Sequence, residues 1–239
     1  MPKYGSWLDL PSVQVAEIMA QTGFDFIVVD LEHGPIGIET AQAQMMAMNG
    51  TDCRSIVRVP EGTEAWVKRV LDAGADGVMV PKVETTEQAA AIVSWAYYAP
   101  KGQRGDARRV VRASGWGKDA EGYKKRWNES GIISVQIESV AGLENIEEIA
   151  TVSGVTQLFY GPSDYSADAG ISIDSKETLA AAAKVASVAK SHGLTCGSVL
   201  FPRGTPQVLA ELGFTYISVA GDVMAMVNSL EESLRNAKG

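Results

Sequence analysis

Short apolar runs alternate with amphipathic helical patterns along the whole chain, and this alternation limits the folds open to it. An apolar run followed by a helical segment is typical of βαβ units, in which helices cover a sheet of parallel strands. Eight such pairs in 239 residues predict a (β/α)8 TIM barrel of the α/β class. The predicted strands are 5–8, 25–30, 54–59, 77–80, 132–138, 156–160, 194–200 and 215–219, and the predicted helices are 11–22, 38–49, 63–73, 85–97, 141–150, 177–191, 205–212 and 222–235.

The competing architecture is a doubly wound open sheet, which binds nucleotides at a glycine-rich loop after its first strand. The sequence has no G-x-G-x-x-G motif there and no G-x-x-x-x-G-K-[ST] motif anywhere, so nucleotide binding is disfavoured. No internal repeat or linker-like composition shift divides the chain, and we expect residues 1–239 to form one domain. The one long irregular stretch is 99–131, which includes the basic segment 99–118.

Composition and charge exclude several classes of protein. The net charge of −8 argues against a general nucleic-acid binder, because phosphate binding needs a basic surface. No stretch of about 18 apolar residues and no signal-peptide pattern is present, so we expect a cytoplasmic protein without a membrane partner. Cys53 and Cys196 lie in apolar runs and are expected to be buried, reduced thiols that form no structural zinc site.

The run V-V-D-L-E-H-G-P at residues 28–35 places Asp30, Glu32 and His33 directly after a buried strand. Barrels of this class carry their catalytic groups at the carboxyl ends of the strands. A helix or turn start with incidental polar residues is the alternative interpretation. His33 is one of two histidines in the chain, and an imidazole group is suited to moving a proton near neutral pH.

Polar side chains also follow the next predicted strands, and we expect them to converge at one face of the barrel. They are Arg58, Lys82, Gln136 with Glu138, and Asp164. Two carboxylates on neighbouring strands, Glu138 and Asp164, suit Mg²⁺, Mn²⁺ or Co²⁺ that is also bound by water and substrate oxygens. Such a cation beside Arg58 would stabilise negative charge on a carbonyl oxygen, as an enolate requires.

The segment G-P-S-D-Y-S-A-D at residues 161–168 follows the sixth predicted strand. Gly161 and Pro162 would shape a turn, after which Ser163 and Asp164 would open a short helix with free backbone N–H groups. Those groups could hold a carboxylate. An ordinary loop with Ser163 as the N-cap of the helix is the alternative.

Together, the motifs D-L-E-H-G-P, V-R-V-P, V-L-D-A-G-A, V-Q-I-E-S and G-P-S-D-Y-S resemble the HpcH/HpaI aldolase family, the metal-dependent class II pyruvate aldolases. The resemblance covers nearly the whole chain and keeps the order and spacing of the motifs. It implies a barrel of the phosphoenolpyruvate/pyruvate type, whose last helix is exchanged between subunits of a homotrimer or homohexamer. The implied reaction is the reversible cleavage of a 4-hydroxy-2-oxo acid to pyruvate and an aldehyde, with a divalent metal as cofactor.

The resemblance also implies roles for individual residues. His33 would be the acid/base group, and Arg58 would stabilise the enolate oxygen. Asp72, in V-L-D-A-G-A, would raise the basicity of His33. Glu138 and Asp164 would bind the metal, and Gln136, Gly161, Ser163 and Asp164 would bind pyruvate.

Asp72 ends a predicted helix that runs antiparallel to the strands, so it should lie at the opposite face of its own barrel from His33. We therefore expect Asp72 to reach His33 of a neighbouring subunit, with Asp30 as the alternative partner within one chain. The arginines of segment 99–118 would complete a neighbour's site for the same reason. Lys82 stands where many relatives have an apolar residue, which bears on the aldehyde half of the pocket.

Two other functions stay open. One is an acyl-CoA ester lyase of the malyl-CoA/citrate lyase type, which is disfavoured because such enzymes usually carry a longer carboxyl-terminal region. The other is a non-catalytic barrel that binds small molecules. The presence of His33, Arg58, Glu138 and Asp164 disfavours this second alternative.

Overall fold

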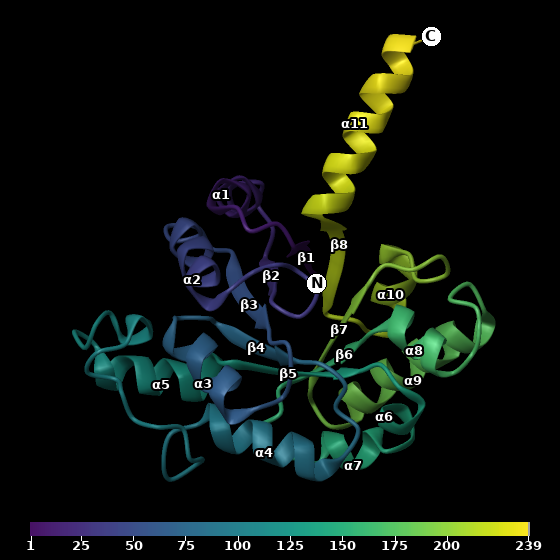
Figure 1. Cartoon of the computed structure of the whole chain (residues 1–239). Coiled ribbons are helices and arrows are strands. Elements are labelled where there is room, and N and C mark those ends of the chain that lie inside the picture. The colour runs from purple at the N-terminus through teal and green to yellow at the C-terminus, as the bar shows by residue number, and fades with distance from the viewer. Residues whose placement is uncertain (239) are drawn as a thin grey trace.

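Eight parallel strands form a closed barrel in the computed structural model, which describes residues 1–238 (Figure 1). The strands follow one another around the barrel in chain order, and the last strand pairs with the first to close it. This arrangement confirms the predicted (β/α)8 TIM barrel. The strands are β1 (Lys3–Leu8), β2 (Phe26–Asp30), β3 (Arg54–Arg58), β4 (Gly77–Val80), β5 (Ile132–Ile137), β6 (Gln157–Tyr160), β7 (Thr195–Val199) and β8 (Tyr216–Gly221).

Helices connect the strands, and those that precede α11 surround the barrel (Figure 1). They are α1 (Val13–Gln21), α2 (Ile38–Ala47), α3 (Glu64–Asp72), α4 (Thr86–Ala96), the 3-10 helix η1 (Arg112–Ser114), α5 (Ala120–Ser130), α6 (Val140–Glu144), α7 (Ile146–Ala150), α8 (Pro162–Asp168), α9 (Lys176–Ser191), α10 (Pro206–Leu212) and α11 (Asp222–Lys238). Local sequence explains several boundaries. Thr85 and Gln88 form a capping box that starts α4. Gly213, with a φ of 105°, ends α10 in the left-handed conformation that glycine adopts without strain.

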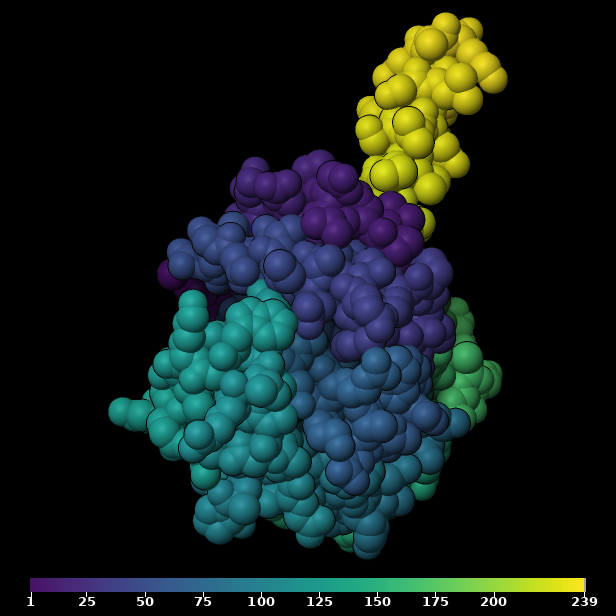
Figure 2. Space-filling model, turned by 60° about the vertical axis from the view of Figure 1, so that its left-hand side comes forward, coloured from purple at the N-terminus to yellow at the C-terminus, as the bar shows by residue number. Residues whose placement is uncertain are grey.

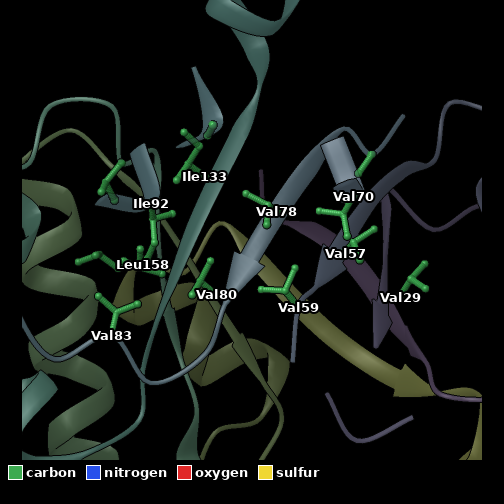
Figure 3. Packing of buried hydrophobic residues seen from close by; sticks show 14 of the residues in the cluster. Val29, Val57, Val59, Val70, Val78, Val80, Val83, Ile92, Ile133 and Leu158 are labelled. Atoms are coloured by element: carbon green, nitrogen blue, oxygen red, sulfur yellow. The ribbon is translucent and has the colours of Figure 1, made fainter. Parts of the chain in front are cut away.

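Alternate residues of each strand face the two sides of the barrel wall. Phe26 and Val28 of β2 belong to a small apolar cluster inside the barrel. Val29 belongs to the larger core between the strands and the helices, together with Val57 of β3 (Figure 3). The next inward-facing position on β2 is Asp30, so the alternation that builds the core also directs a carboxylate into the mouth of the barrel.

Two parts of the chain differ from the prediction. The segment 99–131, predicted to be irregular, contains η1 and the helix α5. Only Tyr123 and Trp127, one turn apart, are buried on α5, and the charged residues around them hide this narrow apolar face in the sequence. The predicted helix 141–150 is broken into α6 and α7 at Asn145, which ends the first helix and precedes the second.

The last helix, α11, projects beyond the body of the molecule instead of packing along the barrel (Figures 1 and 2). Val223, Val227, Leu230 and Leu234 are spaced so that they share one face of α11, and all four are exposed. A helix with such an apolar face is stable in water when a partner surface covers it. Within residues 1–238, no helix combines the length and the apolar character that crossing a membrane requires.

Candidate active site

A cavity of about 610 Å³ opens at the end of the barrel where the strands finish. Glu138 adjoins it through a hydrogen bond to Gln136. Asp72 lies elsewhere, in a separate surface hollow with residues of α2 and the segment after α4. The predicted site residues that line the cavity are His33, Arg58, Gln136, Gly161, Ser163 and Asp164.

Arg58, the last residue of β3, is the central cation of the cavity. Parallel pairing places it directly opposite Asp30 of β2, and the two side chains form a fork in which Nε donates to Oδ1 at 2.8 Å and Nη2 donates to Oδ2 at 2.6 Å. Its Nη1 lies 3.0 Å from Oε2 of Glu32, and its guanidinium stacks over the ring of Trp7 at 4.4 Å from the ring centroid. These contacts fix the direction of the guanidinium and leave little freedom for another rotamer.

Arg58 and the carboxylates around it shift one another's pKa values. Burial disfavours the charged form of Asp30, but the hydrogen bonds and the charge of Arg58 outweigh it and lower the pKa of Asp30. Burial likewise opposes the charge on Arg58, and its bonds with Asp30 nevertheless raise the pKa of the guanidinium. Burial raises the pKa of Glu32, and the charge of Arg58 lowers that pKa only in part. Asp30 and Arg58 therefore each stabilise the charged form of the other.

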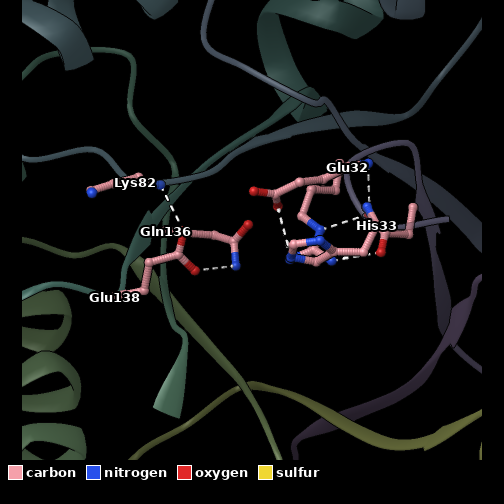
Figure 4. Close-up of polar contacts among 7 residues, drawn as sticks. Glu32, His33, Lys82, Gln136 and Glu138 are labelled. Carbon is pink, nitrogen blue, oxygen red and sulfur yellow. Dashed lines mark hydrogen bonds and ion pairs between the residues drawn. The ribbon is translucent and has the colours of Figure 1, made fainter. Parts of the chain in front are cut away.

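Glu138 follows β5 and is held by two donors (Figure 4). The backbone N–H of Lys82 donates to Oε1 at 2.8 Å, and Nε2 of Gln136 donates to Oε2 at 2.9 Å. Lys82 has a φ of 49°, a left-handed conformation that is uncommon for lysine and that aims its N–H at Glu138. Burial raises the pKa of Glu138 to about 7, and the charge of Asp164 adds to this rise.

The turn into α8 brings two further predicted residues into the cavity. Gly161 is the N-cap of α8 and Pro162 is its first residue, so Ser163 lies inside the first turn and is not the N-cap. A Cβ atom on Gly161 would lie 2.6 Å from Oε2 of Glu138, which explains why the chain has glycine here. The backbone at Gly161 therefore lies against Glu138, Ser163 and Asp164 line the same cavity, and the charge of Asp164 acts on Glu138.

His33 stands at the rim, with its side chain 66% exposed. Its Nε2 lies 4.0 Å from Oε2 of Glu32. Asp30 accepts the backbone N–H of His33 at 3.4 Å, but both of its oxygens are committed to Arg58 and it does not contact the imidazole. Within one chain, the structure gives the imidazole no partner from either predicted carboxylate.

Asp72 ends α3 and is bound by a buried arginine. Arg104 donates to Oδ1 of Asp72 from both Nε, at 3.2 Å, and Nη2, at 2.5 Å. The guanidinium of Arg104 is surrounded by the rings of Tyr98, Tyr123 and Trp127 and also donates to the Tyr123 hydroxyl at 3.0 Å. This cage orients the carboxylate of Asp72 on the outer surface of the barrel, where 20% of its side chain is exposed.

Sequence reasoning missed three polar residues on the β1 and β8 side of the cavity, namely Trp7, Asp9 and Ser218. If alternate residues of β1 face inward from Gly5 onward, Trp7 and Asp9 face the inside of the barrel. The segment is short, and its polar and apolar residues do not alternate regularly, so the sequence does not show this two-residue period clearly. Ser218 lies within an apolar strand and carried no signal of its own.

Comparisons with known proteins agree over the full length of the chain. Residues 3–229 match the HpcH/HpaI aldolase/citrate lyase family. A hydroxypyruvate/pyruvate aldolase of Paraburkholderia phytofirmans is 37% identical, over 99% of this chain and 94% of that protein. A 2-dehydro-3,6-dideoxy-6-sulfogluconate aldolase of Pseudomonas putida is 39% identical, over 98% of this chain and 92% of that protein.

A solved crystal structure shares the fold of this chain. The crystal structure of an HpcH/HpaI aldolase/citrate lyase family protein from Burkholderia cenocepacia J2315 superposes with a TM-score of 0.92 at 32% identity. It covers 100% of this chain, and the match spans 95% of that protein. The barrel and the order of its elements are therefore shared with these proteins.

Proposed function

Because the chain belongs to the HpcH/HpaI aldolase/citrate lyase family, we propose that it is a pyruvate aldolase, a carbon–carbon lyase that reversibly cleaves a 4-hydroxy-2-oxo acid to pyruvate and an aldehyde. The observation that carries this proposal is the fixed cation of Arg58 in a cavity that also holds His33, Gln136 and Asp164. A guanidinium held by two carboxylates can stabilise an enolate without any movement during the reaction.

In the cleavage direction, His33 removes the proton of the C4 hydroxyl group. The C3–C4 bond then breaks, its electrons form the enolate of pyruvate, and C4 leaves as the aldehyde. Arg58 donates to the enolate oxygen as negative charge develops there. Protonation of C3 releases pyruvate, whose polar groups are held by Gln136 and by the backbone at Gly161, Ser163 and Asp164.

The donor groups of the site fit a divalent cation. Oε1 of Gln136 is buried without a hydrogen-bond partner among the described residues, and burial together with the charges of Asp164 and Glu32 raises the pKa of Glu138, which a cation bound there would lower. Residues 1–238 contain no group of three or more histidine, cysteine or acidic side chains arranged to hold a metal ion, so Glu138 and Asp164 would share the ion with water and substrate. Mg²⁺, Mn²⁺ or Co²⁺ would act there as a Lewis acid on the 2-oxo group.

A neighbouring subunit would complete the site. Asp72 is exposed in part and rigidly held by Arg104, which suits a carboxylate that orients His33 of another chain in a homotrimer or homohexamer. The exposed apolar face of α11 supports the exchange of this helix between subunits. Sedimentation should give a trimer or hexamer, and Leu230→Asp on that face should shift it toward smaller species, whereas a fully active monomer would contradict both inferences.

Deuterium exchange at C3 of pyruvate tests the proposed activity, because a binding module has no reason to form an enolate. We expect exchange that depends on Mn²⁺ or Co²⁺ and stops with EDTA. Arg58→Lys should abolish most of it, since lysine cannot reproduce the fork to Asp30. Arg54→Lys, the same change at the other end of β3, is the matched control. Cleavage of malyl-CoA without pyruvate exchange would favour the acyl-CoA lyase instead.

A further inference from the structure

Asp9 and Ser218 line the cavity but are not among the residues that the proposed chemistry uses. Asp9 directly follows β1, and Ser218 lies on β8. The proposed metal and pyruvate ligands come instead from the end of β5 and from the turn between β6 and α8. β1 and β8 are neighbours in the barrel, with Gly5 opposite Ser218 and Trp7 opposite Gly221. Asp9 and Ser218 therefore form a second polar side of the same cavity.

Ser218 is a buried hydroxyl group that points into the cavity. It is 3% exposed, and its Oγ has no hydrogen-bond partner among the described residues. The indole Nε1 of Trp7, also at this side, is likewise buried without a partner. Buried polar atoms are more stable with a hydrogen-bond partner, and at a cavity wall a polar group of a ligand can supply one.

Asp9 is a carboxylate placed at the cavity mouth by its backbone. Its N–H donates to Oδ1 of Asp222 at 3.0 Å, and the N–H of Leu10 donates to Oδ2 of Asp222 at 2.9 Å. Asp9 lines the cavity together with Gly221, which leaves the wall beside the carboxylate without a side chain. The carboxylate can therefore contact a ligand in the cavity, next to the paired strands β1 and β8.

The surroundings of Asp9 are negative. Burial raises its pKa to about 6, and the charges of Asp30 and Asp222 add to the rise, while Arg58 opposes it. Arg58 is already bound by Asp30 and Glu32, so it does not neutralise Asp9. Near neutral pH, this side of the cavity accepts hydrogen bonds and repels a second anion.

We propose that Asp9 and Ser218 bind the aldehyde half of the substrate and select an uncharged hydroxyaldehyde over an aldehyde that carries a carboxylate or sulfonate group. The proposal rests on the proposed aldolase function and adds a substrate class to it. A hydroxyl group beside the aldehyde can donate to Asp9 and exchange a hydrogen bond with Ser218. An anionic group in the same place would face Asp9 at close range in a partly buried site.

Aldol addition of pyruvate to two matched acceptors tests the proposal. Glycolaldehyde and glyoxylate both have two carbons, and they differ in that a carboxylate replaces the hydroxymethyl group. The measured quantity is the ratio of kcat/KM for the two acceptors, with the assembled full-length protein and Mn²⁺. We expect wild type to prefer glycolaldehyde and Asp9→Asn, which removes the charge at nearly constant size, to shift the ratio toward glyoxylate by about tenfold or more.

A second variant keeps the test decisive if Asp9→Asn does not fold. Ser218→Ala should reduce the preference for glycolaldehyde over acetaldehyde, which lacks the hydroxyl group, by about tenfold. Asp52→Asn, an exposed acid after α2, is the control and should leave both ratios unchanged. Wild-type ratios in both site variants, in a protein that exchanges pyruvate deuterium, would overturn the subsite and leave the aldolase function standing. Absence of that exchange in wild type would overturn the function itself.

Discussion

Replacing Arg58 by methionine separates the structural role of this residue from its proposed catalytic role. The substitution keeps most of the side-chain length but leaves Asp30, which is 1% exposed, without the fork of hydrogen bonds at 2.8 and 2.6 Å. Removing one partner of a buried ion pair lowers the free energy of unfolding by about 3–5 kcal/mol. Loss of a donor to a developing oxyanion lowers kcat by about 10²–10³.

A double variant distinguishes the two effects. Arg58→Met combined with Asp30→Asn removes both charges, so it should recover much of the stability that Arg58→Met loses. It should recover none of the activity, because both variants lack the guanidinium that donates to the enolate oxygen. Stability is measured by urea unfolding at a fixed protomer concentration, and activity by deuterium exchange of pyruvate.

Two results would refute this reasoning. Near-normal exchange in Arg58→Met would show that the guanidinium does not stabilise the enolate. Recovery of exchange in the double variant would show that Arg58 acts only by neutralising Asp30, and that its effect on activity is an effect on folding.

Three further predictions concern backbone conformation, metal binding and pH. Lys82→Gly should preserve Mn²⁺ affinity, because glycine accepts the φ of 49°. Lys82→Val should weaken Mn²⁺ affinity and lower the free energy of unfolding by about 1–2 kcal/mol. Equal Mn²⁺ affinities of the two variants, measured by calorimetry, would contradict a positioning role for this backbone. Because Glu138 has a pKa of about 7 without metal, apparent Mn²⁺ affinity should fall about tenfold for each pH unit below 7, and an affinity independent of pH between 5 and 7 would exclude Glu138 as a ligand. The pKa of Asp9 is raised in the folded state from 3.8 to about 6, so the folded protein holds this proton more tightly and loses stability as pH rises through that range. Solvent screening reduces the effect to about 1–2 kcal/mol, and Asp9→Asn should be more stable than wild type by that amount at pH 8 but not at pH 4, as measured by urea unfolding.

The barrel was predictable because its strands are buried on both faces and therefore read as continuous apolar runs. The strand-end rule then found Arg58, Gln136 and Glu138 without knowledge of any contact. The pairing of Asp30 with Arg58 was not predictable, since it depends on the register between β2 and β3, which only the folded barrel sets.

Other parts of the site carried weaker signals. Asp9 follows β1 in a segment that resembles a polar loop in the sequence, and Ser218 sits in an apolar strand. Their proximity depends on closure of the barrel between its first and last strands, about two hundred residues apart in the chain. The helix α5 was missed because its buried face is only two aromatic side chains wide.

Closure of the barrel by β1 and β8 has a consequence for how such enzymes diverge. The proposed enolate-forming groups occupy β2, β3, β5 and the turn after β6, and the proposed aldehyde-binding groups occupy the seam between β8 and β1, which adjoins β2. Asp9 and Ser218 are not among the residues that hydrogen-bond to Arg58 or Glu138. A change at Asp9 or Ser218 can therefore alter the preferred acceptor while the groups that form the enolate keep their places.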